Sequence, residues 1–196
     1  MNKAISSVTS MANPAARETL DAVRDRVGFV PILFASLARQ PGVVESFVAL
    51  DDAFSATTLS PVERQVVLLT ASVENNGVYC VAGHSLFGRS IGVPEQAIEA
   101  IRSDSDVDDP RLAALRTFVA KLVRNRGHVE SGDIEQLTTA GYSRHQMLEI
   151  IMGVTLKTFS NFVDSAMKLP LDAAFEPAAW STPRASTCSA RIDTEA

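Results

Sequence analysis

The feature that most constrains this fold is a series of helix-start signals, after which apolar residues recur every three or four positions. Ser60-Pro61-Val62-Glu63 places a capping serine before a proline at the first helical position and a glutamate at the third. Asp109-Pro110 and Ser143-Arg144-His145-Gln146 give similar signals farther along the chain. Such caps satisfy free N–H groups at a helix start, and the spacing matches one helix face. We therefore predict an all-α fold of about eight to nine helices.

The caps and the stop signals predict where these helices lie. The first cap opens a helix to about Asn75, the second opens one that stops at Gly127, and the third opens a long helix that persists to Leu169 before Pro170 breaks it. Shorter helices are expected over 15–27, 31–39, 42–56, 80–91, 94–102 and 131–139, and no segment predicts a strand.

This pattern predicts one helical domain over residues 15–180. The segment 1–14 is expected to be flexible and the segment 181–196 to be a disordered tail, because the tail offers almost nothing to bury. Trp180 precedes the tail, and a single Trp after the last helix is expected to dock back on the domain.

Composition limits the partners and the location. Of 196 residues, 46% are apolar, enough for a folded core, and the net charge of −5 argues against a nucleic-acid partner. No stretch is long and apolar enough for a membrane span or a signal sequence, so we expect no membrane partner and a cytoplasmic location. The two cysteines, Cys80 and Cys188, exclude a disulfide scaffold and a Cys-rich structural zinc site.

The segment from Glu74 to Ser85 carries the chemistry. Asn76-Gly77 predicts a turn, after which Cys80 falls in the first turn of a helix, where the helix dipole and free N–H groups stabilise a thiolate. His84 lies four residues later on the same face, within reach of the sulfur directly or through a water, so the two form a candidate nucleophile and proton acceptor. The alternative is a small buried cysteine beside an ordinary histidine.

The remaining titratable residues give weaker signals. Glu63 has a structural role in its capping box. Glu74 falls at the C-terminal end of its helix, where the dipole disfavours a carboxylate, so another feature of the molecule must require it. His128 and His145 are interpreted as structural or surface residues. Cys80 and His84 supply only two metal ligands, so no metal site and no cofactor are predicted.

Several segments together resemble a known family. Leu59 to Val67, Glu74 to Asn76 and Tyr79 to Ser85 resemble the core of the alkylhydroperoxidase D and carboxymuconolactone decarboxylase superfamily. Later segments, among them Gly127-His128-Val129 and Gln146-Met147-Leu148-Glu149, resemble its peroxidase-related branch. The resemblance covers about residues 23–180. It implies an alkylhydroperoxidase D-like helical bundle, a homo-oligomer (dimer, trimer or hexamer), and reduction of a small-molecule peroxide at the expense of an external thiol.

The chain also departs from the family pattern. The resemblance matches Cys80 to the second cysteine of the family's pair, which attacks the peroxide, and His84 to the family histidine. Gly77 stands at the position of the first cysteine, which is the resolving one. Gln65 stands where the family has a relay carboxylate. Glu74 and Glu63 are the nearest replacements, Glu74 being the better candidate, and Tyr79 beside the cysteine completes the candidate site.

Three functions fit these observations. The leading hypothesis is a thiol peroxidase-like antioxidant protein in which Cys80 becomes a sulfenic acid that an outside thiol reduces. The second is a decarboxylase-like or isomerase-like enzyme in which His84 and a carboxylate move protons. The third is a catalytically lapsed oligomeric scaffold or ligand-binding protein that has kept the fold.

Overall fold

The computed structural model describes residues 14–182, and within this range the chain is all-helical, with nine α-helices, one 3-10 helix and no strand. The all-α prediction is confirmed. In chain order the elements are α2 (Pro14–Val27), α3 (Ile32–Leu37), α4 (Pro41–Ser55), α5 (Pro61–Glu74), α6 (Val78–Ser90), α7 (Glu95–Arg102), α8 (Pro110–Arg124), α9 (Ser131–Thr139), α10 (Arg144–Met167) and the 3-10 helix η1 (Ala173–Ala178).

The predicted caps are present. Ser60 Oγ accepts a hydrogen bond from the backbone N–H of Glu63 (3.2 Å), and the Glu63 carboxylate accepts one from the N–H of Ser60 (2.8 Å), which opens α5. Ser143 and Gln146 form the same reciprocal pair at the start of α10. The side chain of Asp109 accepts from the N–H of Leu112 (2.9 Å) and opens α8.

Some helix ends differ from the predictions. α3 covers 32–37 rather than 31–39, because the chain turns through residues 38–40 to reach the next helix. α6 begins at Val78, two residues early, so Cys80 is its third residue. α10 ends at Met167 rather than Leu169, because Lys168 adopts a left-handed conformation (φ 51°) that closes the helix.

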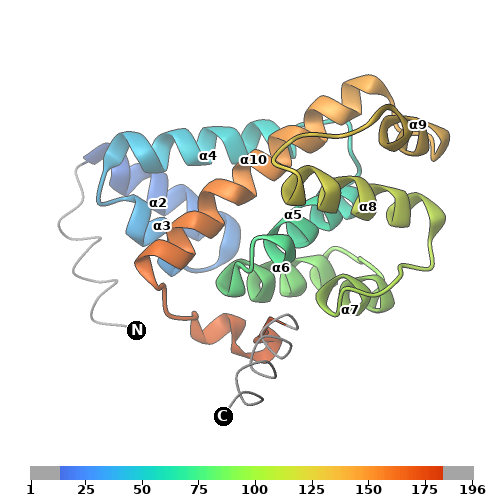
Figure 1. The fold of residues 1–196 in the computed structure, drawn as a ribbon. Coiled ribbons are helices and arrows are strands. Elements are labelled where there is room, and N and C mark those ends of the chain that lie inside the picture. Colours follow the sequence, from blue (N-terminus) through green and yellow to red (C-terminus); the bar gives the residue numbers. More distant parts are fainter. Residues whose placement is uncertain (1–13, 183–196) are drawn as a thin grey trace, which may run out of the picture.

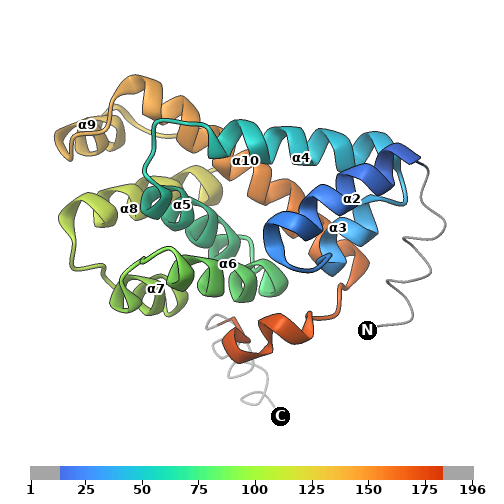
Figure 2. The same ribbon diagram turned by 180° about the vertical axis from the view of Figure 1, so that it is seen from behind.

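Helix α5 is the centre of the molecule. It packs against α6, α7, α8 and α10, and its residues from Val66 to Ser72 are all buried, as expected for a helix surrounded by others. The long helix α10 crosses the molecule and packs against α4, α5 and α6, while η1 packs against α6 (Figures 1 and 2). Residues far apart in the sequence therefore meet where α4, α5, α6 and α10 converge.

Trp180 docks as predicted, because its indole N–H donates to the carbonyl oxygen of Arg102 (2.9 Å). Residues 1–13 and 183–196, which include Cys188, lie outside the described residues, so the predictions for the two terminal segments concern mostly residues that the structure does not describe. None of the helices between residues 14 and 182 is long and apolar enough to cross a membrane.

Candidate active site

A cavity of about 680 Å³ lies among α2, α3, α4, α5, α6, α10 and η1. Its volume is in the range of pockets that bind small organic molecules. Its lining combines an apolar wall with a few polar groups, and both Cys80 and His84 belong to it. The structure therefore places the two strongest candidates from the sequence in one cavity.

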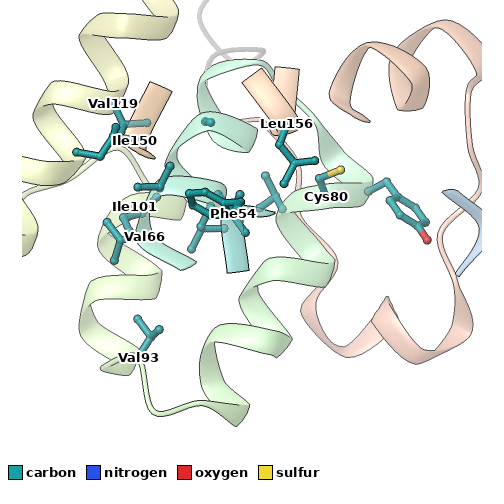
Figure 3. Packing of buried hydrophobic residues seen from close by; sticks show 14 of the residues in the cluster. Phe54, Val66, Cys80, Val93, Ile101, Val119, Ile150 and Leu156 are labelled. Carbon is teal, nitrogen blue, oxygen red and sulfur yellow. The ribbon is translucent and has the colours of Figure 1, made fainter. Parts of the chain in front are cut away.

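Cys80 lies in the first turn of α6, as predicted, and its side chain belongs to the buried core (Figure 3). The residue is 3% exposed. Its thiol donates to Oγ of Ser160 (3.7 Å), and the Ser160 hydroxyl donates in turn to the carbonyl oxygen of Lys157 (3.1 Å). Because that hydroxyl hydrogen is already used, Ser160 accepts from the thiol, and it would have to rotate to donate to a thiolate.

His84 lies one turn after Cys80, with a partner at each ring nitrogen. Nδ1 is 2.9 Å from Oε1 of Gln65, and Nε2 is 2.8 Å from Nζ of Lys157. An ammonium group only donates and an amide oxygen only accepts, so the hydrogen belongs on Nδ1 and Nε2 accepts from the lysine. Within the described residues, neither nitrogen is hydrogen-bonded to the sulfur of Cys80, although the sequence had placed the pair within reach.

These surroundings keep the imidazole neutral. Burial, first, and the positive charge of Lys157, second, hold the pKa of His84 well below its ordinary value near 6.5. Gln65 matters here, because a carboxylate at its position would favour the protonated imidazole and its neutral amide does not. Gln65 therefore contacts His84 through a neutral amide at the position where the resemblance expects a relay carboxylate.

Lys157 is a site residue that sequence analysis missed. It is 5% exposed, lies in the middle of α10 and contributes to the cavity lining. The available signal was its context, since it is the single charged residue between Glu149 and Asp164 in an otherwise apolar and small-polar stretch. Charged residues are rarely buried without a specific partner, and here the partner is His84.

Tyr79 contributes to the cavity lining but uses its hydroxyl elsewhere. The hydroxyl donates to the carboxylate of Asp172, which also accepts from the backbone N–H of Ile32 (3.0 Å). Burial, followed by this carboxylate, raises the pKa of Tyr79 far above its ordinary value. The ring packs edge-on against Phe175, with centroids 5.4 Å apart. Tyr79 therefore connects α6 to η1 and to the start of α3.

The structure does not bring Glu63 or Glu74 into the cavity lining. Glu63 caps α5 and forms an ion pair with Arg111 (2.8 Å). Burial raises the pKa of Glu63, but hydrogen bonds from Ser60 and Arg111 outweigh burial, so its pKa is lowered. Glu74 pairs through both carboxylate oxygens with Arg124 (2.6 Å each). That ion pair explains a carboxylate at a helix C-terminus, where the dipole alone would disfavour it.

The acidic residue that does line the cavity is Asp51 on α4, which sequence analysis did not single out. Burial raises its pKa, while the charges of Lys157 and Arg26 lower it. It is ion-paired with Arg26 (3.3 Å). His128 and His145 are exposed, in agreement with their interpretation as surface residues.

Gly77 has a steric reason to be glycine. The left-handed residue of the predicted turn is Asn76 (φ 55°), whereas Gly77 has a φ of −78° that any residue adopts. A Cβ atom at position 77 would lie 2.7 Å from Cγ of Asn161. Asn161 is 1% exposed, and its Oδ1 accepts a hydrogen bond from Nδ2 of Asn75 (3.1 Å). The Asn161 amide thus fills the space that a side chain at position 77 would need, where the resemblance expects a cysteine.

No group of three or more His, Cys, Asp and Glu side chains within residues 14–182 is placed to hold a metal ion. The polar groups that line the cavity include a thiol, a neutral imidazole, an amide, an ammonium group, two guanidinium groups and one carboxylate. This set can supply a sulfur nucleophile and donate hydrogen bonds to an anion.

Comparison with known proteins agrees with the fold. Residues 41–121 match the model of the carboxymuconolactone decarboxylase family, whereas comparison with curated proteins finds no match. An uncharacterized peroxidase-related protein from Ralstonia eutropha JMP134, an alkylhydroperoxidase AhpD core, has a similar structure, with a TM-score of 0.78 and 23% identity over 85% of this chain and 90% of that one.

Two further structures are similar. An uncharacterized peroxidase-related protein from Silicibacter sp. TM1040 has a TM-score of 0.73 and 22% identity, over 84% of this chain and 90% of that one. The debrominase Bmp8, in a cysteine-to-alanine variant bound to 2,3,4-tribromopyrrole, has a TM-score of 0.72 and 18% identity, over 84% of this chain and 89% of that one. At these identities the likeness concerns the fold.

Proposed function

We propose that this chain is a member of the alkylhydroperoxidase D and carboxymuconolactone decarboxylase superfamily, as the family match over residues 41–121 and the similar folds support. Within that superfamily we propose that it is a single-cysteine thiol peroxidase that reduces organic hydroperoxides. The observation that carries this proposal is the place of Cys80, whose thiol lies at the start of α6 and on the wall of a cavity sized for a small molecule. A helix N-terminus favours the negative charge that a reactive sulfur must carry.

The chemistry balances with one cysteine. The sulfur of Cys80 attacks the outer peroxide oxygen and the O–O bond breaks. The products are a sulfenic acid and an alkoxide, and the alkoxide takes up the proton that the thiol loses to become an alcohol. An external thiol displaces water from the sulfenic acid to form a mixed disulfide, and a second thiol releases Cys80. The sum converts one hydroperoxide and two thiols into an alcohol, a disulfide and water.

The other polar groups support the leaving oxygen rather than the sulfur. Lys157 is the group suited to stabilise the alkoxide that departs, because its ammonium donates hydrogen bonds. His84 accepts from that ammonium and so holds it in place. The acid–base alternative is less well supported. Both ring nitrogens of His84 are hydrogen-bonded, to Gln65 and Lys157, and the one carboxylate in the lining, that of Asp51, is ion-paired with Arg26.

The test is mass spectrometry of the full chain after addition of cumene hydroperoxide with a sulfenic-acid trap, together with turnover supported by dithiothreitol. We expect the trap adduct on Cys80, loss of adduct and turnover in Cys80→Ser, and retention of both in the matched control Cys188→Ser. Turnover that survives Cys80→Ser, or a Cys80 that forms no adduct, would show the proposal to be wrong.

Reductive dehalogenation of an aromatic compound is a second candidate. Five of the nine phenylalanines line the cavity, and the structurally similar debrominase was studied with a brominated pyrrole. In this reaction the sulfur takes the halogen and the ring carbon takes a proton, after which two external thiols release a halide and restore Cys80. Bromide release from tribromopyrrole with dithiothreitol, absent in Cys80→Ser, would favour this activity over peroxide reduction.

We also propose that the protein is a homo-oligomer. Support comes from α10, the longest helix in residues 14–182, which exposes large apolar side chains along its length. Exposed apolar patches of this kind often mark an interface. The residues concerned, with their exposed fractions, are Leu148 (63%), Ile151 (39%), Phe159 (42%), Phe162 (63%) and Met167 (47%).

A further inference from the structure

The cavity contains a buried cation with donor capacity to spare. An ammonium group has three hydrogens, and within residues 14–182 the Nζ atom of Lys157 has one hydrogen-bond acceptor, Nε2 of His84 at 2.8 Å. That acceptor is neutral, because the pKa of His84 is lowered. A charge removed from water is costly unless it is paired, so the remaining hydrogens of Lys157 favour a negatively charged partner.

Asp51, the carboxylate in the lining, lies near enough to Lys157 for the lysine charge to act on its pKa, but no hydrogen bond or ion pair joins the two side chains. Three cationic residues and one acidic residue contribute to the lining, namely Lys157, Arg26, Arg64 and Asp51. Arg26 is ion-paired with Asp51 at 3.3 Å and with Asp52 at 2.7 Å, so the carboxylate in the lining already has a partner. Arg64 donates to backbone carbonyl oxygens, including that of Thr57. The cavity therefore has more positive than negative charge.

The rest of the wall is suited to an apolar body. Besides five phenylalanines, the lining includes several aliphatic side chains. Phe175 packs edge-on against Phe87 (centroids 5.8 Å apart), and Phe87 packs similarly against His84, so aromatic surface continues up to the histidine that holds Lys157. Apolar and charged recognition are thus offered within one cavity.

We infer that the cavity binds a small organic carboxylate, with its apolar body against the phenylalanine wall and its carboxylate on Lys157. A carboxylate fits because one lysine provides a single charge and two remaining hydrogens, one for a carboxylate oxygen and one for the oxygen that leaves the peroxide. This inference deepens the proposed function and rests on it for the reaction: the hydroperoxide reduced at Cys80 is one that also bears a carboxylate.

The test compares two unreactive probes of similar shape, 4-isopropylbenzoate and 4-isopropylbenzyl alcohol, by titration calorimetry with the full chain. We expect the benzoate to bind at least tenfold more tightly. In Lys157→Met its affinity should fall about ten- to hundredfold, the usual effect of losing a hydrogen bond to a charged group, while the alcohol is little affected. Lys157→Arg should keep the preference, and Lys168→Met, an exposed lysine next to α10, should bind as the wild type does.

Two results would overturn the inference. The first is that the wild-type protein binds the two probes equally tightly, or shows no detectable binding of the benzoate at millimolar concentration. This measurement does not depend on whether any variant folds. The other is a benzoate preference that persists in Lys157→Met. Neither probe reacts with sulfur, so binding and turnover are separate tests. A benzoate preference without peroxide turnover would count against the proposed function alone. Turnover of cumene hydroperoxide without a benzoate preference would count against this inference alone.

Discussion

The neutral state of His84 predicts a loss of stability in mild acid. In the folded protein, burial and Lys157 hold the pKa of His84 well below 6.5, whereas in the unfolded chain the ring titrates near that value. Below about pH 6.5 the unfolded state therefore binds more protons, so stability falls as the pH falls. Above about pH 7 the ring is neutral in both states, and this contribution to stability is fully present.

The size of the effect follows from linkage. At pH 5.5, one unit below the unfolded value, protonation of the unfolded chain lowers the free energy of unfolding by about 1.4 kcal/mol if the folded state takes up no proton. For a chain of this length that corresponds to a melting temperature lower by about 3 to 6 °C. The variant His84→Gln removes the titration but keeps an amide that can donate to Gln65 and accept from Lys157.

The assay is thermal unfolding at one protein concentration, at pH 7.5 and pH 5.5, for the wild type and His84→Gln. We expect the wild type to lose about 1.4 kcal/mol more than the variant on acidification, since other groups cancel in the difference. The control variant is His128→Gln, which removes an exposed imidazole outside the cavity. Equal pH responses of wild type and His84→Gln would refute the assignment of a neutral, buried ring.

Three further predictions concern stability and assembly. Glu74→Gln should lower the free energy of unfolding in urea by about 1–3 kcal/mol, because it breaks a charged pair with Arg124, and should leave peroxide turnover unchanged; a large loss of turnover would restore Glu74 as a catalytic candidate. Gly77→Ala should cost about 1–3 kcal/mol by overpacking against Asn161, and in a double-mutant cycle Asn161→Ala should relieve much of this cost. Phe162→Ser should shift sedimentation toward smaller species, and an unchanged distribution would exclude its exposed ring from the interface.

Much of the fold could be predicted from local signals. The Ser60 and Ser143 capping boxes and the Asp109 cap depend on residues at most three positions apart, so the sequence alone indicates where α5, α8 and α10 begin. The relation of Cys80 to His84 is equally local, because the helix repeat places residues four apart on one face. The structure confirms these helix starts and places Cys80 and His84 in one cavity, but no hydrogen bond joins the two side chains.

The environment of these side chains could not be predicted in the same way. His84 meets Gln65 and Lys157 across 19 and 73 residues of chain, and Glu74 meets Arg124 across 50. Each meeting depends on how α5, α6, α8 and α10 cross one another, which no local periodicity specifies.

The sequence by itself determined a helical fold with a cysteine at a helix start, a histidine one turn later, and neither a cysteine at position 77 nor a carboxylate at position 65. Only the tertiary structure decided what these residues do to one another. It buried Lys157 against the histidine and packed Asn161 against Gly77. The physical reason is that charge state and free space depend on the neighbours a side chain acquires when helices pack, and those neighbours come from distant parts of the chain.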